Sequence, residues 1–339
     1  MTIIYMPMKD GLAVLQRQGS QWQATLQMQG ADCWDLEVDP LAHEVAYCAT
    51  LGRGLWQTTD GGQTWGAVGA GIGSDLVWSC AVSRAERVGG AGVVYAGTEL
   101  SALWRSEDRG ATWRELAALR EIPSHDKWSY PPKPKTHHVR CILPDPNQPG
   151  RLFAGIEQGG VMRSLDGGET WEDHNPQAQN DPHTLAATIN APGRIYESGG
   201  GGYRESYDGG NTWQTPDTGM KHHYLFGLAI DPGDPDTVIV SNSANFATAH
   251  FPVITISHVY RKSGGSVWEE VHTGLPRPRG QSVFELGANE AEPGVFYLGT
   301  RTGELYRSAD KGLTWERQDV VWPNSYKPTE IHHLVATEV

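Results

Sequence analysis

The chain has 339 residues, of which 38% are hydrophobic and 20% charged, with 41 glycines and 21 prolines. This composition indicates many short strands and tight turns, and it argues against a protein built from long helices. The formal net charge is −13 and no run of Lys or Arg occurs, which argues against nucleic acid or an anionic membrane surface as a partner.

The N-terminal segment, residues 2–26, predicts three strands with no inner strand before them. It lacks a charged start followed by a long apolar core and a small-residue cleavage site, which a secretory signal requires. No window of the chain reaches the ~18 apolar residues of a membrane-spanning helix. We therefore expect a cytoplasmic protein that does not cross a membrane.

Short apolar segments then recur along the chain, each followed by a second and a third strand-like segment. Six of them have complete sets of later strands, and a seventh ends the chain without any. They read WDLEVDP, WSCAVSR, VRCILPDP, LAATINAP, LFGLAIDP, VFELGANE and, last, HHLVATEV. The two ends should complete one four-stranded unit, so we predict an all-β, seven-bladed propeller formed by residues 1–339 as a single domain, its ring closed by pairing of the N-terminal strands with the C-terminal strand.

An eight-residue pattern follows the third strand-like segment in most of these units. Its copies are TTDGGQTW at 58–65, SEDRGATW at 106–113, SLDGGETW at 164–171, SYDGGNTW at 206–213 and SADKGLTW at 308–315. A degenerate copy, KSGGSVW at 262–268, keeps the glycines and the tryptophan. The pattern predicts a hairpin turn, because Asp accepts backbone N–H groups of its own loop and Gly adopts positive φ.

This repeat resembles the Asp-box, or BNR repeat, of sialidase-like and sortilin-like propellers and of the plant photosystem II assembly factor. The resemblance implies a structural turn on the face away from any active site. It does not imply sialidase activity, because the arginine motif of sialidases is missing; the nearest text is GLPRPRG, at 274–280. Asp-box xyloglucan endoglucanases have two seven-bladed propellers with the glycan between them, and this chain has half of that cleft.

The opposite face gathers histidines. Nine of the 13 histidines lie in segments assigned to it, between blades or in an insertion at 243–255. The same face should receive residues from the loops between second and third strands. Long, proline-stiffened loops at 124–138 and 320–333 repeat a Trp, Ser, Tyr, Lys, Pro, His, His order, including Pro134 in the first, and offer aromatic surface for a sugar.

We therefore expect a hydrolase or lyase of a small molecule or glycan at this face, with a divalent metal, Zn, Mn, Fe or Ca, and no organic cofactor. The expected metal ligands are His138, His183, His223 and His333. The expected catalytic residues are Glu157 or Glu99 as base, Arg301 as anchor of an anionic group, and Tyr224 beside the histidines.

Two alternatives remain open for the histidines: hydrogen bonds that cap strands, and direct acid/base chemistry. The protein could also be a non-catalytic scaffold that binds a protein partner on this face. Cys33, Cys48, Cys80 and Cys141 have no metal-binding spacing and lie in apolar segments, so we expect buried thiols rather than disulfides or zinc ligands.

Overall fold

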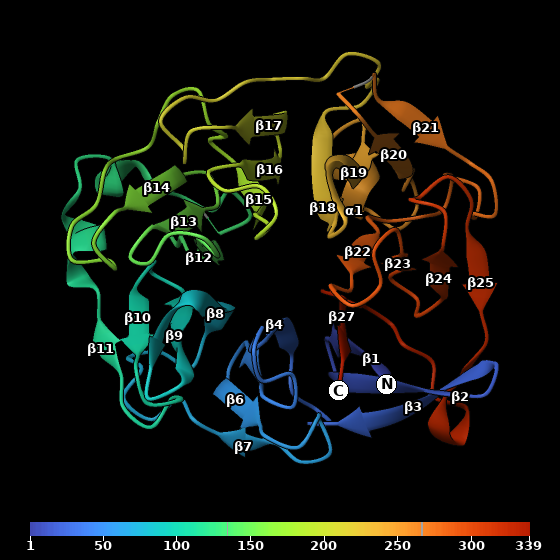
Figure 1. Ribbon diagram of the computed structural model, residues 1–339, viewed down its shortest axis with the longest axis horizontal. Coiled ribbons are helices and arrows are strands. Elements are labelled where there is room, and N and C mark those ends of the chain that lie inside the picture. Colours follow the sequence, from blue (N-terminus) through green and yellow to red (C-terminus); the bar gives the residue numbers. More distant parts are fainter. Residues whose placement is uncertain (134, 266) are drawn as a thin grey trace.

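The computed structural model describes residues 1–133, 135–265 and 267–339, and these residues form seven sheets around a central axis (Figure 1). Each sheet is one blade of a propeller, and its strands are ordered from the axis outward. The chain is therefore an all-β, seven-bladed propeller, as the sequence predicts. Within the described part of the chain, no helix is long and apolar enough to cross a membrane.

The first six blades follow the chain order. The first two contain β4 (Cys33–Val38), β5 (Ala46–Thr50), β6 (Gly54–Thr58) and β7 (Gly66–Ala67), then β8 (Val77–Val88), β9 (Ala91–Thr98), β10 (Leu103–Ser106) and β11 (Arg114–Glu115). The next two contain β12 (Val139–Pro144), β13 (Leu152–Ile156) and β14 (Gly160–Ser164), then β15 (Pro182–Ala186), β16 (Ile195–Gly199) and β17 (Gly202–Ser206). The fifth and sixth contain β18 (Tyr224–Asp231), β19 (Asp234–Ser243), β20 (His258–Lys262) and β21 (Glu269–Val271), then β22 (Glu285–Ala288), β23 (Phe296–Gly299), β24 (Leu305–Ser308) and β25 (Glu316–Gln318).

The seventh blade joins the two ends of the chain. The C-terminal strand β27 (Val335–Glu338) is innermost and pairs antiparallel with β1 (Thr2–Met8), which is followed by β2 (Gly11–Gln18) and β3 (Gln21–Gln27). The predicted closure of the ring is thus confirmed. A fifth strand, β26 (Val320–Val321), pairs parallel with β3 on the outer edge, which the sequence did not indicate.

Seven apolar clusters lie between the blades, and each joins two neighbouring blades. One of them combines Tyr5 and Leu12 of the seventh blade with Leu36 and Cys48 of the first. Because both faces of a blade are covered in this way, second strands such as β5, β9 and β13 are buried along their whole length. The ring is closed by buried surface as well as by strand pairing.

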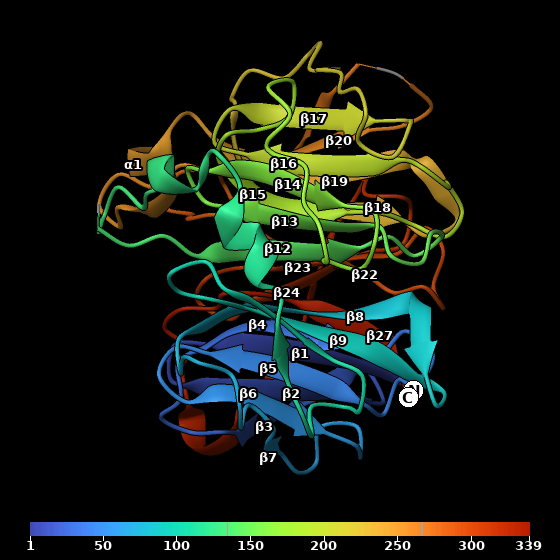
Figure 2. The same cartoon turned by 90° about the vertical axis from the view of Figure 1, so that its left-hand side faces the viewer.

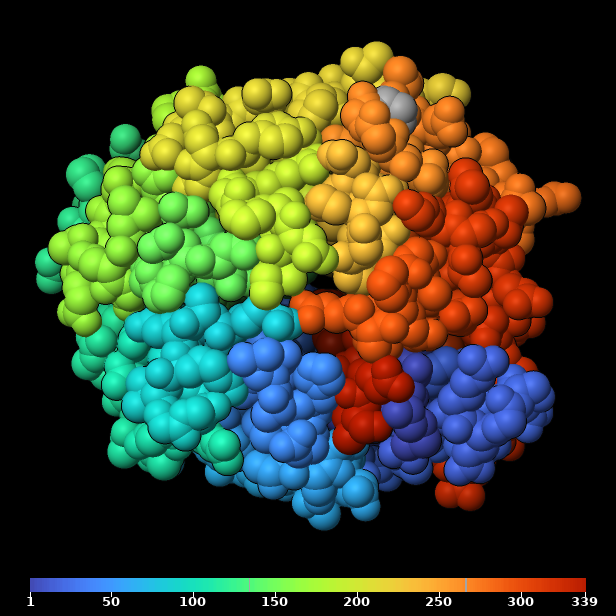
Figure 3. All heavy atoms as spheres, viewed as in Figure 1, coloured from blue at the N-terminus to red at the C-terminus, as the bar shows by residue number. Residues whose placement is uncertain are grey.

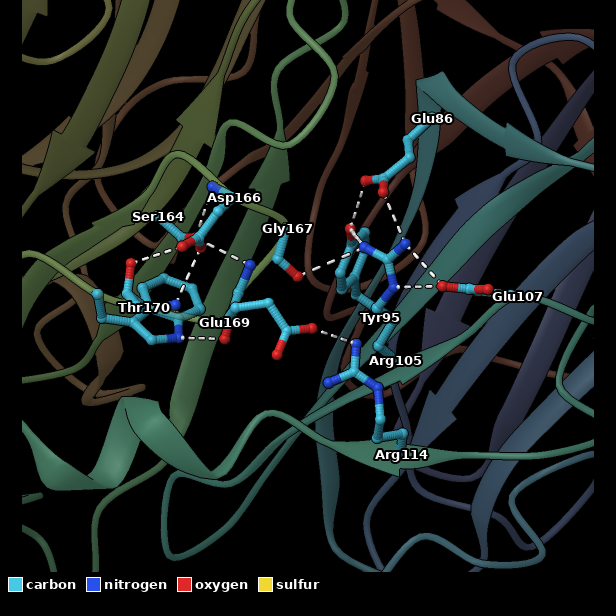
Figure 4. A network of polar contacts seen from close by, with 12 residues as sticks. Glu86, Tyr95, Arg105, Glu107, Arg114, Ser164, Asp166, Gly167, Glu169 and Thr170 are labelled. Atoms are coloured by element: carbon cyan, nitrogen blue, oxygen red, sulfur yellow. Dashed lines mark hydrogen bonds and ion pairs between the residues drawn. The ribbon is translucent and has the colours of Figure 1, made fainter.

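The five intact copies of the repeat form the same turn. In the third copy, Ser164 Oγ donates to Asp166 Oδ1 at 2.8 Å and accepts the Gly168 N–H at 2.8 Å. The N–H and hydroxyl of Thr170 donate to the two Asp166 oxygens at 2.9 and 2.6 Å (Figure 4). Equivalent threonine-to-aspartate bonds occur at Asp60, Asp108, Asp208 and Asp310. Ser266 of the degenerate copy lies outside the described residues.

Arginines on the third strands tie three of the turns to the preceding blade. Arg105 Nη1 donates to the Gly167 carbonyl at 3.4 Å, while Glu86 and Glu107 accept from the same guanidinium at 2.6 and 2.9 Å (Figure 4). Arg163 makes the equivalent bond to Gly209 at 2.7 Å. These bonds hold adjacent blades in register, and they depend on residues that the repeat pattern does not include.

The helical segments are short. They are η1 (Ala117–Glu121), η2 (His125–Lys127), α1 (Phe246–His250) and η3 (Pro323–Ser325). Helix α1 lies on the side of the ring opposite the chain termini (Figure 2). Viewed along the ring axis, the surface is hollowed at the centre, where the blades meet (Figure 3).

The four cysteines are free thiols. Cys33, Cys48 and Cys80 are buried, and Cys141 is half-buried. Burial raises the pKa of Cys141 to about 12, so this thiol stays protonated at neutral pH. The expectation of unlinked thiols is confirmed.

Candidate active site at the mouth of the channel

The candidate residues gather at one end of the channel because of how the strands run. In an antiparallel blade, the first strand begins where the second ends, and the pairing of Val139 with Ile156 therefore brings His138 next to Glu157. We call this end of the channel the mouth. A cavity of about 340 Å³ extends inward from it. Its lining combines aliphatic residues with polar and aromatic ones, which include Trp34, Asp35, Arg140, His183, Phe226, Glu285, His332 and His333.

His138 and Glu157 form a buried pair. His138 Nε2 donates to Glu157 Oε2 at 3.0 Å, and the ring stacks on Trp78 with centroids 3.8 Å apart. Burial lowers the pKa of His138, so the ring is neutral. Although burial opposes ionisation of Glu157, the hydrogen bond from His138 and the charge of Arg140 lower its pKa to about 2. Glu157 is therefore a fixed carboxylate.

Glu157 also belongs to a group with Asp181 and His183. One ligand atom of each lies within 4.8 Å of the others, and this is the metal-ligand group found among the described residues. His183 Nδ1 lies 2.5 Å from the Leu225 carbonyl and must donate to it, so in the neutral ring the lone pair is on Nε2. That Nε2 atom is 3.7 Å from Asp181 Oδ2. Burial raises the pKa of Asp181, whose Oδ1 is buried without a hydrogen-bond partner among the described residues.

Tyr224 lies on the other side of His183. Their rings are 5.1 Å apart, and the Tyr224 hydroxyl is 3.3 Å from Nε2 of His250, on α1. Burial and the nearby charge of Arg301 lower the pKa of His250 to about 4. The neutral His250 ring can accept the hydroxyl proton of Tyr224. The insertion that contains His250 thus contributes directly to the mouth.

His333 lies deeper, inside the channel. Its Nδ1 is 2.8 Å from Asp35 Oδ1. Burial acts against charge, yet the hydrogen bond and the charge of Asp35 raise the pKa of His333 and lower that of Asp35. Burial raises the pKa of the neighbouring Glu285 to about 7 and that of Glu37 to about 8. His333 is therefore committed to an ion pair in an acidic part of the channel.

The four histidines expected as ligands do not form one set. No three of their ring nitrogens meet within 4.8 Å in the described part of the chain. His223 points outward, about half exposed, with Nδ1 3.8 Å from Asp217 Oδ2. Successive residues of a strand face opposite sides, so Tyr224 and not His223 faces the mouth. His138 and His183 both approach Glu157, whereas His333 pairs with Asp35.

Two further expected residues already have partners. Glu99 accepts from Trp78 Nε1 at 3.3 Å, and Trp78 supports His138, so Glu99 positions the His138 ring. Arg301 makes a close ion pair with Glu330. The anion anchor expected at Arg301 is therefore engaged by the chain itself.

The two similar loops do different things. In the first, the Tyr130 ring is 4.9 Å from His138 and 6.0 Å from Trp78, so it borders the mouth. Pro134 of this loop lies outside the described residues. In the second loop, Trp322 and Tyr326 pack against each other and onto the outer strands of the seventh blade. The corresponding tyrosines of the two loops are therefore placed differently.

Sequence reasoning missed Asp181 and Arg140. Asp181 stands two residues before His183 in the same inter-blade segment, and that spacing was the available signal. Arg140 sits inside an apolar first strand, where it faces the channel. The arrangement as a whole defines a seven-bladed β-propeller with carboxylates, imidazoles and aromatic rings converging at one mouth.

Comparison with known proteins supports the fold. No model of a protein family matches the chain, and no curated protein matches it. A GH74 enzyme from Niastella koreensis matches at 17% identity and a TM-score of 0.67, over 93% of this chain and 52% of its own. The GH74 xyloglucanase from Xanthomonas campestris matches at 17% identity and 0.63, over 84% and 45%.

A second kind of match is YCF48 bound to D1 peptide, at 16% identity and a TM-score of 0.58, over 94% of this chain and 84% of its own. At these identities the similarity shows the fold alone. The chain spans about half the length of the GH74 enzyme from Niastella koreensis. The matches agree with the seven-bladed propeller fold that the resemblance implies.

Proposed function

We propose that the protein is a metal-assisted hydrolase or lyase that acts on a glycan or small polar molecule at the mouth of the channel. Glu157, Asp181 and His183 hold the divalent cation. The observation that carries this proposal is the Nε2 lone pair of His183, directed at two carboxyl groups with ligand atoms within 4.8 Å.

These three groups need a positive charge between them. Glu157 is ionised, and His183 presents a lone pair because its Nδ1 proton is engaged by the Leu225 carbonyl. Without a cation, a proton on Asp181 has to fill the gap, and burial favours that form. A backbone acceptor on the far nitrogen is also how metal-binding histidines are usually oriented. Two oxygens and one imidazole suit Mn, Fe or Zn better than Ca, which prefers oxygen ligands.

The surrounding residues supply the rest of the chemistry. A cation bound there would polarise a substrate oxygen or lower the pKa of a bound water. His138 holds the Glu157 carboxylate in place through its hydrogen bond. Tyr224, paired with His250, is a proton donor or acceptor beside His183.

The shape and lining of the mouth support a glycan or small polar substrate. The cavity volume of about 340 Å³ is at the small end of typical ligand sites. Trp34 and Tyr130, both partly exposed, are aromatic side chains of the kind on which sugar rings pack. The glycoside hydrolases among the matching structures add weight to this choice.

Thermal unfolding with and without metal tests the proposal. A cation at 100 times its Kd stabilises the folded state by ~2.7 kcal/mol. For 339 residues at ~2.1 cal/mol/K each, the unfolding entropy is roughly 0.7 kcal/mol/K, so Tm should rise by roughly 4 °C. We expect this rise with Mn²⁺ or Zn²⁺ after treatment with a chelator, and we expect Asp181→Asn and His183→Gln to abolish it.

His223→Gln is the matched control, because His223 points away from the site; it should keep the full metal response. Activity is then measured on neutral and acidic polysaccharides, by release of reducing ends and by ultraviolet absorbance of unsaturated products. A wild-type Tm that does not respond to any of Mn²⁺, Fe²⁺ and Zn²⁺ would refute the metal-assisted mechanism.

A second candidate function is a scaffold that grips a protein partner. It is favoured by exposed apolar side chains in the insertion around α1, where Phe251 is 51% and Val253 94% exposed. The match to YCF48 bound to D1 peptide is consistent with such a role. Replacing Phe251 and Val253 by Ser would leave metal binding unchanged and remove partner binding.

A further inference from the structure

Arg140 is a nearly buried charge with almost no partner inside the protein. Its side chain is 11% exposed and lines the channel cavity. The guanidinium stands over the rings of Phe226 and Trp34, at 5.1 and 5.6 Å from the ring centres. Its closest charged neighbour is Glu157, with Nε 3.7 Å from Oε2, and it makes no hydrogen bond to any side chain or carbonyl among the described residues.

The other buried arginines of the chain show how unusual this is. Arg105 and Arg194 are equally enclosed, at 9% exposure each. Arg105 is engaged by Glu86 and Glu107, and Arg194 by Glu205 and Asp236, all within 2.5–2.9 Å. A guanidinium carries five N–H donors, and leaving them unpaired after desolvation is costly. The outer nitrogens of Arg140 are without hydrogen-bond acceptors in the described part of the chain and lie beside a cavity, so a ligand in the cavity could supply those acceptors.

We infer that Arg140 anchors the carboxylate of a sugar acid, such as a uronate residue. This inference rests on the proposed function and names its substrate class. A planar guanidinium fork matches a carboxylate through two parallel hydrogen bonds. The Trp34 and Phe226 rings beside the guanidinium fix the plane of the fork.

The charges around Arg140 favour a carboxylate over a phosphate. Asp35, Glu157 and Glu285 all lie close enough to feel its charge. A phosphate with nearly two negative charges would be repelled by these groups about twice as strongly as a carboxylate with one. A single arginine is enough for a carboxylate, and Arg301 is not free to help because it pairs with Glu330.

Binding of matched sugars to the full chain tests this inference. The affinities of galacturonate and glucuronate are compared by calorimetry with those of galactose, glucose and the methyl esters of the two uronates. Glucose 6-phosphate is included to test whether the site prefers a phosphate. The acids should bind at least roughly 10-fold more tightly than the neutral sugars and esters, as expected for a charge-assisted pair. Arg140→Met should weaken the acids by roughly 10- to 100-fold and leave the neutral sugars unchanged.

Arg140→Lys keeps the charge without the fork and should give an intermediate loss. Arg53→Met, at an exposed arginine on the same face, should change nothing. Four outcomes would each overturn the assignment. They are equal affinity for uronates and their esters, no binding of either acid, unchanged uronate binding by Arg140→Met and Arg140→Lys, and tighter binding of glucose 6-phosphate than of the uronates. Metal titration of the same samples separates the two ideas: a chain that binds Mn²⁺ without preferring uronates refutes this inference alone.

Discussion

The turn around Asp166 gives a direct test of what stabilises the blades. Replacing Asp166 by Ala removes the acceptor of three hydrogen bonds, from the Ser164 hydroxyl at 2.8 Å and from the N–H and hydroxyl of Thr170 at 2.9 and 2.6 Å. At about 1 kcal/mol for each bond, and with a discount because the turn faces solvent, the loss is roughly 2 kcal/mol.

That loss converts to a modest but measurable change in Tm. With an unfolding entropy of roughly 0.7 kcal/mol/K for the chain, Asp166→Ala should lower Tm by roughly 3 °C in differential scanning calorimetry. Asp126→Ala is the control, because the Asp126 side chain is 99% exposed and contacts only its neighbour His125. Equal Tm values for the two variants would show that the turn carboxylate contributes nothing to stability.

Three further outcomes follow from the same geometry. The pKa of His333 is raised and that of Asp35 is lowered, so the pair stabilises the fold fully between their ordinary pKa values of 6.5 and 3.8. This stability is lost as pH rises through the raised pKa of His333 or falls through the lowered pKa of Asp35. His333→Gln should therefore flatten the decline of the unfolding free energy above neutral pH, measured by urea denaturation. Arg105→Met leaves Glu86 without its partner and should cost roughly 3 kcal/mol, or roughly 4 °C in Tm, with no effect on metal binding. The three buried thiols, Cys33, Cys48 and Cys80, should react with a disulfide reagent only after unfolding in denaturant, so rapid labelling of these residues in the native protein would contradict their burial.

The fold could be predicted from the sequence because its rules are local and repeated. Each turn is specified by a Ser or Thr, an Asp, a Gly and a Thr within seven residues, and a further first strand follows the turn. Ring closure followed from counting, since the last inner strand had no outer strands of its own. The parallel strand β26 could not be found in this way, because two residues on an outer edge carry no pattern.

The site was predictable only in part, because it depends on which of two adjacent residues faces inward. His138 and Tyr224 face the mouth, while their neighbours His137 and His223 pair elsewhere, with Ser101 and Asp217. A shift of one residue in a strand reverses the face, and repeats of unequal length do not fix that register. Whether a charge is already paired, as Arg301 is, depends on contacts between distant segments.

Glu157 links the two proposals, because it is a proposed metal ligand and also the carboxylate closest to Arg140. Replacing Arg140 should therefore change the affinities for Mn²⁺ and for uronate in opposite directions. Arg140 lies 3.7 Å from Glu157, the same carboxylate that is proposed to hold the cation. Removing its positive charge should strengthen Mn²⁺ binding, by roughly 3- to 10-fold at low ionic strength, since two like charges no longer compete for one carboxylate. The same Arg140→Met change should weaken uronate binding. If Arg140 only neutralised Glu157 for the stability of the fold, its loss would affect Tm and leave uronate affinity unchanged. Stronger Mn²⁺ binding together with weaker uronate binding is therefore a result that a purely structural arginine cannot give.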